Sequence, residues 1–159
     1  MTATIDTGLN KSERKDVARE LTKVLSDTFA VYLKTHGYHW NVRGPQFFTL
    51  HTLLEEQYRE MWEALDVIAE RIRAVGELAP QGYGAFGNLT SIKDGDPEKD
   101  SDAMLTELMK DHETTIATCR KALTAAEGDG DDVTVDLLTA RLASHEKAAW
   151  MLRSTLGGR

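Results

Sequence analysis

The sequence predicts an all-α protein, a four-helix bundle with one long crossover. Four stretches without proline carry apolar residues at three- and four-residue spacing, the period of an amphipathic helix: about 11–36, 46–74, 101–127 and 132–156. The prolines all fall between these stretches: Pro45, Pro80 and Pro97. Two connections are short and the middle one, from Gly76 to Lys99, is long. Short connections indicate antiparallel neighbours, and the long one indicates a crossover.

Each stretch has an apolar stripe that should face a common core. In the first stretch the stripe consists of Val17, Leu21, Val24, Leu25, Thr28 and Tyr32. In the second it consists of Leu50, Leu54, Tyr58, Met61, Leu65, Ile68 and Ile72. In the third it consists of Leu105, Leu108, Met109, Ile116 and Leu123. In the fourth it consists of Val135, Leu138, Leu142, Trp150 and Leu156.

The breaks between the stretches carry residues that end or begin helices. The segment 41–45 separates the first two stretches, and a helix start tolerates the missing N–H of its proline. The segments 100–102 and 128–132 offer aspartate caps for the third and fourth helices. The long connection is rich in glycine, and its apolar patch at 86–92 indicates a short extra helix. This connectivity is that of ferritin-like folds, with a long crossover between the second and third helices.

Length and composition limit the classes of function. The chain has 159 residues, which fits one bundle domain over 11–156 and a flexible N-terminal tail over 1–10. The single cysteine, Cys119, forms no intrachain disulfide and no thiolate metal site. No apolar stretch approaches the ~20 residues of a spanning helix, and no secretory signal begins the chain, so we expect a cytoplasmic protein. The net charge of −7 argues against a basic nucleic-acid-binding surface. The acidic balance suits cations, although solubility explains it equally well.

The second stretch carries four candidate metal ligands on one face. At ~100° per residue, with His51 at zero, Glu55 lies near ~40°, Asp66 near ~60° and Glu70 near ~100°. Such a stripe is often only a solvated face. Trp62 lies in the middle of this one, near ~20°, where a helix that meets only water seldom has an indole. The stripe should therefore pack against another surface.

The spacing of the ligands indicates a second copy of the chain. His51 and Asp66 are fifteen residues apart, or roughly 22 Å along a helix, so one helix cannot bring both pairs to one metal. A two-fold axis would place His51 and Glu55 of one subunit opposite Asp66 and Glu70 of its partner. His39, at the end of the preceding helix, is a fifth candidate ligand. Imidazole combined with carboxylate favours iron, zinc or manganese over calcium.

These residues resemble the motif of the Dps family, the mini-ferritins named as DNA-binding proteins from starved cells. The matching residues are His39-Trp40-Asn41, His51, Glu55, Asp66 and Glu70. The resemblance implies a dodecameric shell with ferroxidase sites across its two-fold interfaces. These sites would oxidise Fe(II) to Fe(III), with hydrogen peroxide as the preferred oxidant. The family usually has aspartate at the position of Glu55, and the longer side chain could alter the weaker iron position.

The resemblance also implies an iron entry pore and a DNA-binding tail. The matching pore candidates near the start of the fourth helix are Asp131, Asp132 and Asp136. Helix capping explains the first two equally well. The family often binds DNA through a lysine-rich tail, whereas this chain begins with basic and acidic residues in mixture: Lys11, Glu13, Arg14, Lys15 and Asp16. We therefore expect DNA binding to be weak.

The sequence is interpreted as an iron-storage and detoxification protein that protects against oxidative stress. The first alternative is a DNA-compacting structural protein with a vestigial metal site. The second is a ferritin-like enzyme that uses iron on an organic substrate. No Glu-x-x-His pair occurs in the chain, which counts against the intrasubunit di-iron site of larger ferritins. His36, His112 and His145 are expected to be surface or bundle histidines.

Overall fold

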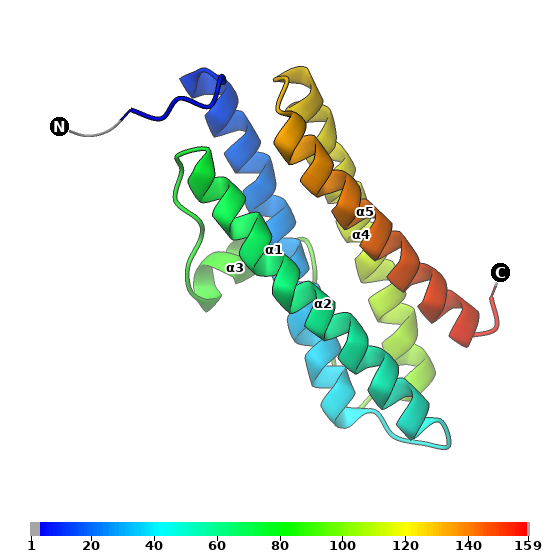
Figure 1. Ribbon diagram of the computed structural model, residues 1–159. Helices are drawn as coiled ribbons and strands as arrows, with labels where there is room; N and C mark the ends of the chain where they lie inside the picture. The colour runs from blue at the N-terminus through cyan, green and yellow to red at the C-terminus, as the bar shows by residue number, and fades with distance from the viewer. Residues whose placement is uncertain (1–3, 159) are drawn as a thin grey trace.

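The computed structural model describes residues 4–158 and contains five helices within that range (Figure 1). They are α1 (Lys11–Asn41), α2 (Phe47–Ala74), α3 (Tyr83–Leu89), α4 (Ser101–Gly128) and α5 (Asp132–Thr155). The described part of the chain contains no strand. The all-α prediction is confirmed. Part of the predicted tail, residues 1–3, lies outside the described residues, and the division into tail and bundle stays a prediction.

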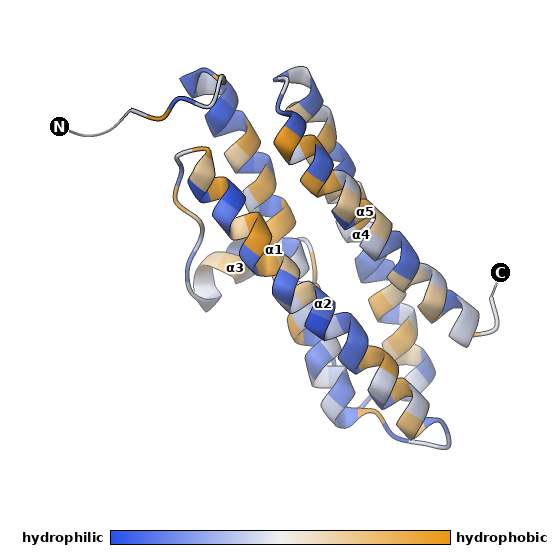
Figure 2. Cartoon of the chain, viewed as in Figure 1, coloured by the Kyte–Doolittle hydropathy of each residue, from blue (hydrophilic) through white to orange (hydrophobic). Residues whose placement is uncertain are grey.

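The four long helices form two antiparallel hairpins, α1 with α2 and α4 with α5 (Figure 1). The hairpins join mainly where α1 packs against α4, whereas α2 and α5 touch only lightly. The crossover from α2 to α4 carries α3, which packs against α1. Figure 2 shows apolar and polar residues interleaved along each long helix, as amphipathic helices require.

The predicted apolar stripes meet in the core, with one exception: Trp150 of the fourth stripe is 57% exposed, so the prediction that it faces the core is wrong. The largest core cluster joins α1, α2, α4 and α5 through residues that include Leu21, Ile68, Cys119 and Leu138. A second cluster around Leu54 and its neighbours fills the other end of the bundle. The burial of such side chains supplies most of the free energy that holds helices of this length together.

Polar side chains at the element ends fix where the helices start. Asn10 caps α1 in a capping box with Glu13, and Asp100 caps α4 by accepting a hydrogen bond from the Ala103 N–H. The crossover is attached to the bundle by the buried carboxylate of Asp27, which accepts from Thr90 Oγ1 and from the Ser91 N–H at 2.8 and 2.7 Å. These contacts set the register of the crossover against α1.

The first helix is longer than its apolar pattern indicates. The pattern fades near residue 36, yet α1 continues to Asn41. Tyr38 and His39 lie on the added turn with 2% and 7% of their surfaces exposed, so tertiary burial extends the helix past Gly37. Because of this extension, His39 faces the beginning of α2. No helix within residues 4–158 is long and apolar enough to cross a membrane.

Candidate functional site

Two histidines from neighbouring helices lie face to face at one end of the α1–α2 hairpin. The rings of His39 and His51 stack with centroids 3.7 Å apart and an angle of 18° between their planes. His39 Nδ1 lies 2.8 Å from the backbone oxygen of His51, and His51 Nδ1 lies 2.9 Å from the backbone oxygen of His39. The two helices are therefore connected by a reciprocal pair of side-chain to backbone hydrogen bonds.

These hydrogen bonds decide which nitrogen of each ring can bind a metal. A carbonyl oxygen only accepts, so each Nδ1 must carry the proton and donate it. In the neutral ring, Nε2 then has a free lone pair. A backbone carbonyl in this position is the usual partner that fixes the tautomer and orientation of a metal-binding histidine. His39 and His51 are thus arranged to offer two Nε2 atoms as ligands.

Two residues that the sequence pattern did not assign to the site pack beside this pair. Tyr58 meets the His39 ring edge-on, with centroids 5.1 Å apart, and stacks on His36 at 3.9 Å. Partial desolvation lowers the pKa of His36 below its ordinary value, and the nearby His39 and Arg59 add to this effect. A neutral aromatic wall therefore supports one side of the histidine pair. In the sequence, the helical spacing of His36 from His39 and of Tyr58 from His51 already indicated that these side chains share a face with the histidine pair.

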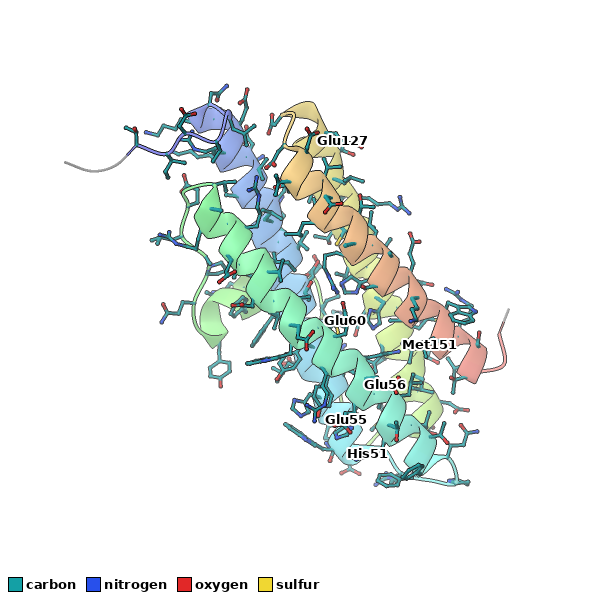
Figure 3. The ribbon with its side chains drawn as sticks, viewed as in Figure 1. His51, Glu55, Glu56, Glu60, Glu127 and Met151 are labelled. Carbon is teal, nitrogen blue, oxygen red and sulfur yellow. The ribbon has the colours of Figure 1, made fainter. Side chains whose placement is uncertain are left out.

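Glu55 lies one turn after His51 on α2, and Figure 3 labels both. Its carboxylate accepts two hydrogen bonds from the Arg59 guanidinium, at 2.8 Å from Nε and 2.6 Å from Nη2. The hydrogen bond from Arg59 and the charge of its guanidinium hold the pKa of the Glu55 carboxyl below its usual value. The ion pair is exposed, so its contribution to stability is small and Arg59 can swing away at little cost.

Asp66 and Glu70 lie farther along the same helix, and both are exposed. Neither makes a side-chain hydrogen bond or ion pair with any residue between 4 and 158. Because α2 is one continuous helix, they remain about 22 Å from the histidine end. The structure thus brings His39 and His51 into contact, places Glu55 one turn along α2 from His51, and leaves Asp66 and Glu70 apart. Among the described residues of one chain, no three His, Cys, Asp or Glu side chains are grouped to hold a metal.

The acidic residues at the start of α5 do not form one group. Asp131 is buried, caps α5 through the Thr134 N–H, and pairs with Arg71 Nη2 at 2.6 Å. The capping alternative therefore applies to Asp131, whose oxygens are occupied. Asp132 and Asp136 stay as the candidates for a pore, because both are exposed.

Comparison with known proteins agrees with this fold. The sequence pattern of the ferritin-like domain matches residues 18–158. The chain is 37% identical over 142 residues to DNA protection during starvation protein 2 of Bacillus anthracis, covering 89% of this chain and 97% of that protein. The chain belongs to the Dps family. The predicted membership is confirmed.

Solved Dps structures share the whole fold. DpsC from Streptomyces coelicolor superposes with a TM-score of 0.93 and 30% sequence identity, covering 98% of this chain and 92% of that one. The Dps protein from Vibrio cholerae superposes with a TM-score of 0.91 and 26% identity, covering 98% and 99% of the two chains. That protein is described as a member of the broad superfamily of ferritin-like diiron-carboxylate proteins.

Proposed function

We propose that this Dps protein oxidises ferrous iron at sites shared between two subunits and stores the ferric product in a hollow dodecamer. Hydrogen peroxide is the proposed oxidant, so that iron and peroxide are consumed together and the cell is protected from hydroxyl radicals. Family membership supports iron handling in general terms. The observation that carries the proposal is the reciprocal hydrogen bonding that leaves both Nε2 atoms of His39 and His51 free.

Each proposed ligand has a role set by its chemistry. His39 and His51 supply neutral nitrogen ligands to the incoming iron. Glu55 of the same subunit adds an oxygen ligand once it leaves Arg59. Asp66 and Glu70 of a second copy neutralise and bridge the two ferrous ions, and their lack of partners among residues 4–158 leaves their oxygens available. The iron is substrate here, and two ferrous ions supply the two electrons that reduce one peroxide.

The location and the weak DNA affinity are part of the same proposal. We place the protein in the cytoplasm, with residues 1–10 as a tail and 11–156 as the bundle. The net charge of −7 per chain repels the phosphate backbone, and the mixed charges near residues 11–16 give the start of the chain little basic character.

Iron loading tests this function. The purified protein should take up far more iron than it has sites when ferrous iron and peroxide are added in alternation, and it should retain the iron through gel filtration. A DNA-compacting protein with a vestigial site would retain little iron. An enzyme acting on an organic substrate would bind iron only to the level of its sites. Either of these outcomes would contradict iron storage.

The His51→Ala variant tests whether iron oxidation depends on the proposed site, since it removes one proposed nitrogen ligand. The Thr52→Ala variant serves as its match, because Thr52 is exposed on the adjacent position of α2. Rapid oxidation should be lost in the first variant and kept in the second.

A further inference from the structure

A small cavity lies between α2, α4 and α5, apart from the histidine pair described above. Its volume is about 180 Å³. The cavity exists because α2 and α5 touch only lightly and side chains do not fill the space between them. Figure 3 labels three of its lining residues, Glu56 and Glu60 on α2 and Met151 on α5, where these helices face one another. Its apolar wall consists of Leu53, Met61, Ala148 and Met151.

Two buried polar side chains that line this cavity carry atoms without a hydrogen-bond partner among residues 4–158. Gln57 is 8% exposed, and neither its amide nitrogen nor its amide oxygen has a hydrogen bond within residues 4–158. His112 is 1% exposed, and its Nε2 likewise has no partner there. Buried polar atoms in native proteins nearly always have a protein, water or ligand partner. These three atoms therefore point to a hydrogen-bonding occupant.

A chain of hydrogen bonds decides the character of His112 Nε2. Arg141 Nη2 lies 3.2 Å from His145 Nε2, and because arginine only donates, that nitrogen accepts. The proton of neutral His145 is then on Nδ1, which donates to His112 Nδ1 at 2.9 Å. Burial lowers the pKa of His112 to about 4, so the ring is neutral and carries its proton on Nε2. His112 Nε2 is therefore an N–H donor that lines the cavity. Because it carries a proton, this nitrogen has no free lone pair for a metal ion.

The charges around the cavity select an uncharged ligand. Glu60 is ion-paired with Arg141. Glu56 and Lys147 are exposed lining residues of opposite charge. The buried polar groups, Gln57 and His112, are neutral. A charged head group beside the buried Gln57 and His112 would lose its hydration there. The charges of Glu56 and Lys147 lie exposed to water, which screens them, so they offset little of that costly loss.

We propose that this cavity binds small uncharged primary carboxamides. The ligand carbonyl accepts from His112 Nε2–H and from the Gln57 amide N–H, while the ligand NH₂ donates to the Gln57 oxygen. All three unpartnered atoms are satisfied in this arrangement. A short alkyl group lies against the apolar wall. The volume equals that of about six liquid waters, which suits a molecule the size of propionamide.

Propionamide and propionate test the proposal, because they have nearly the same shape and differ in charge. Saturation-transfer NMR on the assembled, iron-free protein measures the binding of each. Propionamide should bind with a Kd on the order of millimolar, as its few heavy atoms allow. Propionate should bind about tenfold more weakly or worse.

Gln57→Leu removes the pairing amide and keeps the volume, so propionamide binding should be lost. Gln81→Leu is the matched control, since Gln81 is exposed in the crossover, and it should bind propionamide like the unchanged protein. If Gln57→Leu does not assemble, Ala148→Leu fills the cavity instead and should also abolish binding.

Three results would overturn the proposal. The first is an absence of signal from propionamide, which would mean that water alone fills the cavity. The second is equal binding of propionamide and propionate, and the third is undiminished binding in both cavity variants. The measurement uses no iron and no oxidant, so its outcome is independent of the proposed ferroxidase function.

Discussion

Mixing two inactive variants should restore iron oxidation if the ferroxidase site is shared between subunits. The variants are His51→Ala and Asp66→Ala. On the single helix α2 these residues are about 22 Å apart, whereas ligands of one metal lie within a few ångströms of each other, at bonds of about 2.0–2.2 Å. In a mixed dimer, one interface site collects both substitutions and the other collects none.

The size of the recovery follows from counting. Random mixing in equal amounts makes half of all dimers mixed, and each mixed dimer has one intact site of two, so about a quarter of the wild-type rate should return. The variants are unfolded in denaturant, combined and refolded together, and assembly is checked by gel filtration. Stopped-flow absorbance then measures the initial rate of ferrous iron oxidation with peroxide.

The matched control mixes His51→Ala with His39→Ala. These residues contact one another within one chain, so every mixed site carries one substitution and no activity should return. Refutation would come from assembled His51→Ala and Asp66→Ala mixtures that oxidise iron no faster than either variant alone. Equal recovery in the control mixture would also refute the shared site.

Three further predictions concern stability and DNA. Burial lowers the pKa of His112 to about 4 and the pKa of His145 well below its ordinary 6.5, so the unfolded chain binds more protons than the folded one between these values. Stability is therefore highest above pH 6.5 and falls as the pH approaches 4, by about 3 kcal/mol from His112 alone. Between pH 7 and pH 5 this fall amounts to about 2 kcal/mol, and urea unfolding at these two pH values should show it rather than equal midpoints. Asp131→Ala removes a helix cap and leaves the partly buried Arg71 unpaired, so it should lower the free energy of unfolding by about 2–4 kcal/mol. Urea unfolding at fixed protein concentration measures this loss, and the exposed control Asp132→Ala should lose less than about 0.5 kcal/mol. Duplex DNA should not be bound tightly in ~150 mM salt; a stable gel-shift complex that disappears on deletion of residues 1–15 would show that the mixed-charge start binds DNA after all.

The sequence by itself determined the fold class and the family. Apolar residues at helical spacing, two short breaks and one long break are local features, and local features are enough to define four amphipathic helices with one crossover. The spacing of His51 and Asp66 on one helix also predicts that the proposed metal site needs ligands from two chains. Both conclusions depend only on distances along the chain.

The tertiary structure decided which atoms are free to act. Only the packing of α1 on α2 shows that His39 and His51 bond to each other's backbone and leave their Nε2 atoms free. Only the approach of Arg71 shows that Asp131 is a buried cap. The cavity beside Gln57 likewise depends on how far α2 and α5 diverge. Periodicity fixes the face on which a side chain lies, but its partners come from other helices, whose positions result from the packing of the whole core.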